Sequence, residues 1–369
     1  MKLRYKILNS IVAILVVGIA VLAVFISYDS ECEPVPAAPD GADTMKAVVY
    51  TCYGSSDVLQ YVDIEKPVPG DAEVFVKVRA AGVNPLDVHY MTGSPYLMRL
   101  SSGTGKPDDI SMGVDFAGIV EAVGSDVTKF SPGDRVYGGW GGAFAEYLAM
   151  PEDRGIAKIP DSVSFEQAAS LPIAAVTALQ SLRDHGGVEA GQKVLINGAS
   201  GGVGTYAVQI AKSMGAEVHG VCSTRNVELV KSLGADHVYD YKKESYTDSG
   251  EQYDVILDMV SNESLSANRS VMKPDGRLVI VGGDKGNWIA PLKRPIAAMI
   301  TNWFVDQEIG AMLAVVNQDD LQVLADLMES GQLTSSISER YPLAEIANAL
   351  DLSATRRARG KIVITIGAD

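Results

Sequence analysis

The sequence predicts an α/β protein in which a doubly wound parallel sheet of the Rossmann type is joined to a second, mostly β domain, behind an N-terminal transmembrane helix. Three observations support this fold class: an apolar run from Ile7 to Ile26, a β-rich pattern after Met45, and helices that alternate with strands after Phe165. The 369 residues are enough for two domains, and a hydrophobic content of 47% is typical of a globular protein.

The first 28 residues are predicted to be a membrane anchor. The run Ile7–Ile26 is interrupted only by Asn9 and Ser10, and about 20 apolar residues span a bilayer core of roughly 30 Å. We favour an uncleaved anchor over a cleaved signal, because the end of the run offers only a poor cleavage site. Residues 29–44, rich in Pro, Ala and Asp, are expected to be a flexible linker, and residues up to Asp43 are expected to make no core contact.

The side of the membrane on which the folded domains lie stays open at this stage. The span is preceded by cations and followed by acids: Lys2, Arg4 and Lys6, then Asp29, Glu31 and Glu33. This asymmetry places the N-terminus in the cytoplasm and the domains outside it.

Composition argues against two kinds of site. A net charge of −15 argues against a nucleic-acid partner, since binding there depends on Lys and Arg that neutralise phosphates. The three cysteines, at 32, 52 and 222, show no C-x-x-C spacing and no even framework, so they indicate neither a disulfide nor a cysteine metal site.

Residues 45–167 are predicted to form the β-rich domain, and residues 168–309 the Rossmann domain. Short strands with Gly and Pro punctuation are expected in the first of these at 45–50, 71–81, 117–124 and 133–138. In the second, strands are expected at 194–196, 217–222, 237–239, 253–258 and 277–281. Residues 310–369 hold two helical segments and a closing strand at 361–366.

The glycine turn at 197–204 predicts a dinucleotide site. An apolar strand enters the turn and a segment with helical spacing leaves it, so the backbone N–H groups and the helix dipole favour a diphosphate. Gly201 lets the backbone approach the phosphates, and Gly204 lets the helix pack close to the strand. The residues assigned to this cradle are Ala199, Ser200, Gly201, Gly202, Val203 and Gly204.

The next strand favours NADPH over NADH. It ends in Ser223, Thr224 and Arg225 without the Asp or Glu that binds the ribose hydroxyls in NAD sites. Two hydroxyls and a guanidinium suit a 2′-phosphate, whereas a carboxylate would repel it. Lys242 adds a second cation after the following strand, and Tyr241 and Gly282 complete the predicted cofactor set. Reduced nicotinamide cofactor is normally a cytosolic resource, which conflicts with the orientation that the charge asymmetry indicates, so the side of the membrane stays open.

A series of motifs in order along the chain resembles the medium-chain dehydrogenase/reductase superfamily, in its zinc-free, quinone oxidoreductase-like branch. The resemblance covers Met45 to Ile366 and rests on the segments 81–87, 113–118, 133–136, 142–147, 171–178 and 199–204. It implies that residues 45–167 form a GroES-like catalytic domain to which the tail, 310–369, returns. It also implies that Asn84 and Asp87 lie on the substrate side, Tyr53 near the mouth and Thr177 against the nicotinamide.

The residues that bind zinc in zinc-dependent relatives are replaced here. Those relatives carry Cys where this chain has Asn84, and Gly-His-Glu where it has Gly113-Val114-Asp115. A catalytic zinc needs thiolate and imidazole ligands, which an amide and an aliphatic side chain do not replace. We therefore expect no metal.

Candidate roles follow for the residues around Asn84. The Asn84 amide can hold an acceptor oxygen and polarise a carbonyl without metal. Asp87 is either a functional carboxylate or a buried cap, and His89 or Tyr90 can deliver the proton that follows the hydride. Residues 99–107 are either a mobile lid or only a surface loop.

These features predict an NADPH-dependent reductase of quinones or α,β-unsaturated carbonyls that acts without zinc. One alternative is a zinc-independent alcohol or aldehyde reductase. A second alternative, from another class, is a non-catalytic cofactor-binding module at the membrane. We expect a homodimer formed by edge strands, to which the apolar segment 288–304 contributes, although that segment also suits a membrane-facing patch.

Overall fold

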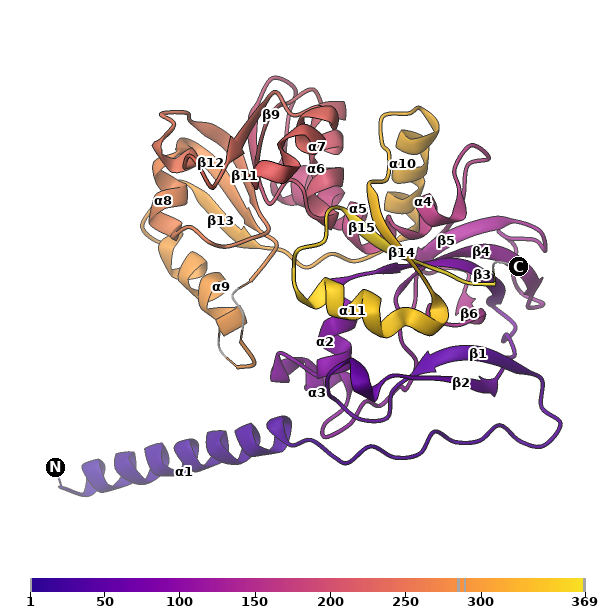
Figure 1. Ribbon diagram of the computed structural model, residues 1–369. Coiled ribbons are helices and arrows are strands. Elements are labelled where there is room, and N and C mark those ends of the chain that lie inside the picture. The colour runs from indigo at the N-terminus through magenta and orange to yellow at the C-terminus, as the bar shows by residue number, and fades with distance from the viewer. Residues whose placement is uncertain (1, 284–285, 289, 368–369) are drawn as a thin grey trace.

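The structure, a computed structural model, describes residues 2–283, 286–288 and 290–367. Figure 1 shows two folded bodies, one built around a parallel sheet and one rich in antiparallel strands, with a single long helix leading into them. The predicted fold class is confirmed.

The β-rich domain contains a seven-stranded sheet in the order β14-β15-β3-β4-β5-β7, with β6 paired to β3. In β3, Val74, Val76 and Val78 alternate towards the core with partly exposed neighbours, so one face of the strand is buried. A separate antiparallel hairpin, β1–β2, lies beside the sheet. The strands are β1 Thr44–Val49, β2 Gln60–Glu65, β3 Glu73–Val83, β4 Asp115–Val123, β5 Arg135–Gly139, β6 Tyr147–Pro151, β7 Ile156–Lys158, β14 Ile337–Pro342 and β15 Lys361–Thr365.

The C-terminal segment lies on this same sheet. β15 pairs antiparallel with β3, so that Val363 faces Gly82, and β14 covers the outer edge of β15. A strand from the end of the chain therefore becomes a neighbour of the strand that leads to Asn84.

The second domain is a six-stranded, all-parallel sheet in the order β10-β9-β8-β11-β12-β13. The strand order reverses between β8 and β11, and ligands of such sheets bind at the carboxyl ends of the strands flanking that point. The strands are β8 Lys193–Asn197, β9 Glu217–Cys222, β10 His237–Asp240, β11 Tyr253–Asp258, β12 Met272–Ile280 and β13 Glu308–Ala311. β13 crosses the boundary expected at residue 309.

Helices cover this parallel sheet and join the two domains. Those that follow strands of the parallel sheet are α6 Gly202–Ser213, α7 Val227–Ser232, α8 Leu265–Ser270 and α9 Ala290–Thr301. The remaining ones are α2 Pro85–Thr92, α3 Arg99–Ser102, α4 Phe165–Ala169, α5 Pro172–Gln180, α10 Gln318–Glu329 and α11 Ile346–Ala354. One hydrophobic core runs from Tyr137 of the β-rich sheet through Leu179 of α5 to Val194 of the parallel sheet. The two domains are therefore packed against each other through apolar side chains.

The N-terminal helix, α1 Lys2–Ser27, contains a stretch long and apolar enough to cross a membrane. Asn9–Ser27 has a mean hydropathy of 2.9, and 6% of this stretch is buried in the structure. A signal sequence has the same length and apolar character. The side chain of Ile26, at the end of this helix, is buried against the folded domains.

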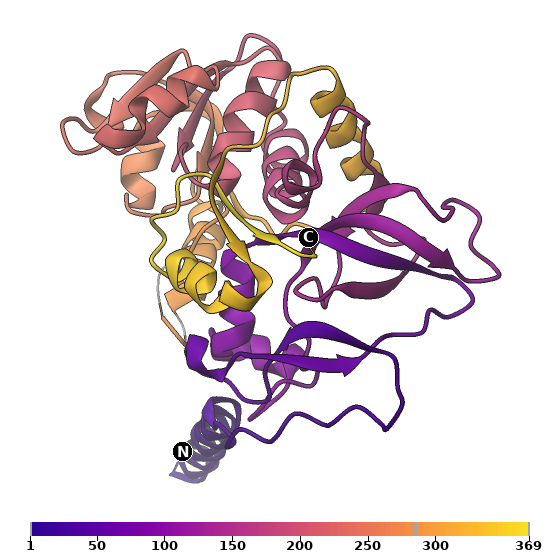
Figure 2. The ribbon, with the colours of Figure 1, turned by 45° about the vertical axis from the view of Figure 1, so that its right-hand side comes forward.

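Two expectations about the segment after α1 are wrong. Cys32 and Cys52 form a disulfide, with their Cα atoms 4.7 Å apart, because the chain doubles back along the β1–β2 hairpin (Figure 2). The segment is also not free of core contacts: Val35 packs on the apolar cluster formed by Met45, Ala47 and their neighbours. Spacing along the chain could not reveal a pairing that depends on the path of an extended segment.

Candidate active site

The glycine turn has the geometry of a phosphate cradle. β8 ends at Asn197, Gly198 has a φ of +97°, and α6 begins at Gly202. A Cβ at Gly204 would overlap the carbonyl oxygen of Gly198, whereas a Cβ at Gly201 would come no closer than 3.4 Å to that atom. Gly204 is thus required by packing, and Gly201 leaves open space above the turn.

The start of α6 suits an anion. Within the described residues, no side chain caps this helix at Gly201, so its first N–H groups have no side-chain acceptor. Nearby, Asn226 donates from Nδ2 to the Oγ atoms of Ser200, at 2.9 Å, and Ser223, at 3.3 Å. The Oδ1 atom of Asn226 is buried and has no hydrogen-bond partner among the residues that the structure describes. These residues fit the diphosphate and the adenosine ribose of a dinucleotide.

The residues predicted for a 2′-phosphate gather at the end of β9. Arg225 is exposed, and its Nη2 donates to the carbonyl of Arg357 at 3.0 Å. The side chain of Lys242 is exposed, and its backbone N–H donates to Oδ1 of Asp240 at 3.1 Å. A hydrogen bond from the Thr224 side chain is the largest of several interactions that lower the pKa of the Asp240 carboxyl.

Of the remaining predicted cofactor residues, two lie around the same sheet edge and one does not. Tyr241 is 58% exposed, and its N–H donates to the carbonyl of Cys222. Gly282 follows β12, and its carbonyl accepts a hydrogen bond from Ser261 Oγ at 2.8 Å. Thr177 is buried in α5 with its hydroxyl bonded to the carbonyl of Ile173 at 2.6 Å. The structure therefore places Thr177 in the helix that joins the domains rather than at the sheet edge.

Asn84 lies in a buried polar network. Its Nδ2 donates to Asp115 Oδ2 at 2.9 Å, and its Oδ1 accepts from the Lys361 ammonium at 2.6 Å. Lys361 also forms an ion pair with Asp115 at 3.5 Å, and both side chains are at most 2% exposed. The amide expected to hold a substrate oxygen is instead occupied by protein partners.

Burial shifts the pKa values of the two charged groups in this network. Burial lowers the pKa of Lys361 and raises that of Asp115, and the charge of each partner opposes the shift of the other. Asp115 Oδ1 also accepts from the N–H of Ile173, in the first turn of α5, where a negative charge is favourable. The carboxylate thus connects Asn84 to the helix that joins the domains.

Asp87 takes the position of a helix cap. Its Oδ2 accepts the N–H of Asn84 at 2.7 Å, at the start of α2. Its Oδ1 is buried, and no hydrogen-bond partner for it lies in the part of the chain that the structure describes. Burial raises the pKa of Asp87 to about 8. Of the two alternatives left open by the sequence, the geometry favours the cap.

His89 and Tyr53 also form hydrogen bonds with backbone carbonyls. His89 Nδ1 lies 2.6 Å from the carbonyl of Ser94, so this nitrogen carries the proton, and burial lowers the pKa of the ring. The Tyr53 hydroxyl donates to the carbonyl of Gly103 at 2.7 Å, within the segment 99–107. Tyr53 therefore holds that segment rather than pointing freely towards a substrate.

The sequence reasoning missed three residues. Lys361 opens a closing strand and could be taken for a solvated strand end, and Asp115 was considered only as a substitute for a zinc-family residue. Arg356 has a φ of +57°, lies close enough to lower the pKa of His89, and approaches the carbonyl of Gly283 at 3.5 Å. The basic run 356–359 was a signal that could have identified it.

Comparison with known proteins assigns the family. Human quinone oxidoreductase is 33% identical over 323 residues, which cover 84% of this chain and 94% of that protein. The chain belongs to the medium-chain dehydrogenase/reductase superfamily. Residues 70–161 match the alcohol dehydrogenase GroES-like domain, and residues 233–364 match the zinc-binding dehydrogenase family.

Two further members of the superfamily show how far the similarity extends. The chloroplast envelope quinone oxidoreductase homolog of Arabidopsis thaliana is 32% identical, over 87% of this chain and 98% of its own. The structure of the quinone oxidoreductase from Coxiella burnetii has a TM-score of 0.77 at 30% identity, over 88% of this chain and 99% of its own. This medium-chain dehydrogenase/reductase is accordingly an NAD(P)H-dependent oxidoreductase, and the interpretation as a non-catalytic module is set aside.

Proposed function

We propose that the protein is a zinc-independent, NADPH-dependent reductase of quinones or α,β-unsaturated carbonyls. The observation that carries the proposal is the similarity over the whole folded region to proteins named quinone oxidoreductases. Zinc independence is supported by the residues at the two positions that carry Cys and His in zinc-dependent relatives. Asn84 is hydrogen-bonded to Lys361 and Asp115, and the side chain of Val114 has no atom that could bind a metal.

In this proposal the chain binds the cofactor at the edge of the parallel sheet. Gly201, Gly202 and the α6 N-terminus hold the diphosphate, and Ser223, Thr224 and Arg225 hold the 2′-phosphate. The bound cofactor supplies a hydride to the acceptor. Asn84, Asp115 and Lys361 act as positioning residues, because they join the substrate-side loop, α5 and β15 at one point.

The proton that follows the hydride is assigned to Tyr90. The Nδ1–H of His89 is bonded to Ser94, so the neutral ring offers only Nε2, an acceptor. The Tyr90 hydroxyl is a hydrogen-bond donor at neutral pH, as a phenol ordinarily is, and burial raises its pKa further. Tyr90→Phe is expected to lower kcat while leaving the Kd for NADPH unchanged; a variant with full kcat would exclude this role.

The reaction is tested by following the loss of absorbance at 340 nm with a panel of quinones, enones and aldehydes. Turnover of quinones or enones with little turnover of aldehydes would support the proposal. A preference for aldehydes would favour the alternative alcohol or aldehyde reductase.

The cofactor preference has a separate test. NADPH is expected to bind at least about ten times more tightly than NADH, which corresponds to about 1.4 kcal/mol. Arg225→Ala should remove most of this difference without weakening NADH. The matched control is Lys231→Ala, because Lys231 is a solvated cation on the neighbouring helix α7. Equal affinities in the unmodified protein would contradict the preference.

We further propose that α1 anchors the protein and that the folded domains form a homodimer. β13 is an edge strand of the parallel sheet, and Trp303 and Phe304 beside it are 77% and 79% exposed. Alkaline carbonate washing should leave the full-length protein in the membrane fraction. Sedimentation of the detergent-solubilised protein as a monomer at micromolar concentration would argue against the dimer.

A further inference from the structure

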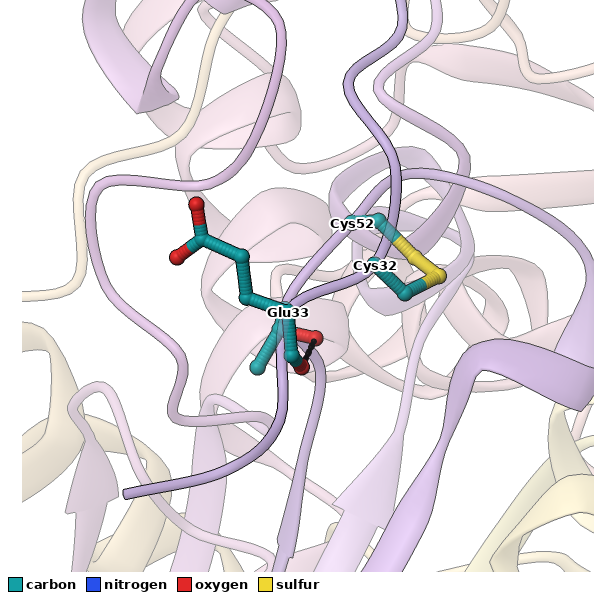
Figure 3. Close-up of a disulfide and its surroundings, with 4 residues drawn as sticks. Cys32, Glu33 and Cys52 are labelled. Atoms are coloured by element: carbon teal, nitrogen blue, oxygen red, sulfur yellow. Dashed lines mark hydrogen bonds between the residues drawn. A yellow bond between two sulfur atoms is a disulfide. The ribbon is translucent and has the colours of Figure 1, made fainter.

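The segment Ile26–Glu33, which we name the strap, is fixed to the β-rich domain by a covalent bond. The disulfide joins Cys32 of the strap to Cys52, which directly precedes Tyr53 in the chain (Figure 3). Beside the disulfide, the hydroxyl of Thr51 donates to the carbonyl of Glu33 at 2.6 Å. The strap is therefore held at the end that is farther from the membrane helix.

Arg99 holds the other end of the strap. Its Nη1 donates to the carbonyls of Ile26, at 3.2 Å, and Tyr28, at 3.0 Å, and its Nη2 forms an ion pair with Asp29 at 2.8 Å. The Arg99 side chain is 2% exposed, and its guanidinium lies 4.4 Å from the centre of the Tyr53 ring. A cation that donates hydrogen bonds to carbonyls at the C-terminal end of α1 also complements the helix dipole.

Between these ends the strap lies along the segment 99–107. The N–H of Ser30 donates to the carbonyl of Gly105 at 2.8 Å, and Lys106 pairs with Glu33 at 2.7 Å. The same segment also accepts a hydrogen bond from the Tyr53 hydroxyl, at the carbonyl of Gly103. The segment 99–107, expected to be either a lid or a surface loop, is thus bonded both to the strap and to Tyr53.

The disulfide bears on the compartment in which the domains lie. Cys32 and Cys52 each lose a proton and together lose two electrons as the S–S bond forms, and a thiol–disulfide oxidant of the compartment gains them to become a dithiol. Such bonds persist in oxidising compartments and are rare in the reducing cytosol. The charge asymmetry of the span points to the same side, because its cations precede it and its acids follow it.

We infer that both folded domains stand on the oxidising, non-cytoplasmic side of the membrane, with the disulfide-locked strap as a brace between the membrane helix and the segment 99–107. This inference rests on the membrane anchoring proposed above, but not on the identity of the substrate. Together with the proposed reaction, it requires that NADPH be available on the non-cytoplasmic side of the membrane. Two independent features of the chain, the disulfide and the charge asymmetry, agree on the orientation. The brace keeps the segment 99–107 close to the membrane surface from which α1 emerges.

The thiol state is tested on the full-length protein in its own membranes. Free thiols are blocked with N-ethylmaleimide in denaturant, and the remainder are reduced and counted with a polyethylene glycol maleimide on a gel. Two cysteines should become reactive only after reduction, in the unmodified protein and in Cys222→Ser. Cys32→Ser should show none, because Cys52 is then a free thiol. Cysteines that are all free before reduction would overturn the inference.

The orientation is tested by labelling sealed cells with a membrane-impermeant maleimide. The reporter is Glu329→Cys in the Cys222→Ser background, because Glu329 is exposed at the end of α10. Labelling without lysis supports the inference, and labelling only after lysis overturns it. Release of the protein by carbonate would contradict both the membrane anchoring and this inference. Absence of turnover with every substrate in the panel would contradict only the proposed reaction.

The brace is tested by cleavage with a glutamate-specific protease in detergent. Glu31 and Glu33 are exposed, but they lie in the strap, which is fixed to the β-rich domain. Cleavage at these residues therefore requires local unfolding of the strap. Cys32→Ser should speed cutting at these two sites by about tenfold or more, because the closed loop is lost. Cys222→Ser should not change the rate. Equal rates in Cys32→Ser and the unmodified protein would show that the strap is not a brace.

Discussion

Replacement of Lys361 by methionine is expected to destabilise the protein far more than the same replacement on the surface. The Lys361 ammonium lies 2.6 Å from Asn84 Oδ1 and 3.5 Å from Asp115 Oδ2, and neither of the charged partners is more than 2% exposed. Removal of the cation leaves the Asp115 carboxylate buried without its counter-charge. Breaking such a pair from one side costs about 3–5 kcal/mol.

The expected change in melting temperature follows from this free energy. For a large domain, each kcal/mol lowers Tm by roughly 2–4 °C, so Lys361→Met should lower it by roughly 6–20 °C. Cofactor binding should weaken as well, because the neighbouring Gly360 N–H donates to the carbonyl of Ser200 in the glycine turn at 3.0 Å. Circular dichroism melts and NADPH titrations of the detergent-solubilised protein measure both effects.

Two variants make this reasoning refutable. Lys212→Met breaks a pair with Asp236 in which both side chains are more than 30% exposed, and it should cost at most about 1 kcal/mol. The double variant Lys361→Met with Asp115→Asn removes the buried charge together with its partner, and it should recover part of the lost stability. A Lys361→Met variant as stable as Lys212→Met, or a double variant with simply additive losses, would refute the account of this network.

Three further predictions concern the same site. Burial raises the pKa of Asp87 to about 8 in the folded state, above an unfolded value of about 3.9, so its contribution to stability is complete below pH 4 and is lost as the pH rises through 8. Asp87→Asn, measured by urea unfolding at several pH values, should remove a dependence of up to about 1.4 kcal/mol per pH unit; an unchanged profile would exclude Asp87 as its source. Gly204→Ala should prevent folding, since its Cβ would overlap Gly198, whereas Gly201→Ala should fold and lose NADPH affinity, which thermal melts and titrations distinguish. Elemental analysis should find less than one zinc per chain, and chelators should leave activity and Tm unchanged; one tightly held zinc per chain would contradict the zinc-free proposal.

Local patterns in the sequence were sufficient for the fold class and for the strand, turn and helix around residues 197–204. The turn at 197–204 is flanked by an apolar strand and a segment of helical spacing, and β8 and α6 lie on either side of it as expected. The apolar run at the N-terminus likewise predicted α1. Such features are readable because a strand, a turn or a helix depends mainly on neighbours within a few residues.

Only the tertiary structure determined which side chains meet. Lys361 and Asn84 are 277 residues apart in the chain, and they become neighbours because β15 pairs with β3. Arg99 reaches the end of α1, and Cys32 reaches Cys52, because an extended segment without its own periodicity returns across the hairpin. The sequence therefore determined the elements and the phosphate turn, whereas the partners of Asn84 and the path of the strap follow from packing between distant segments, which no local pattern encodes.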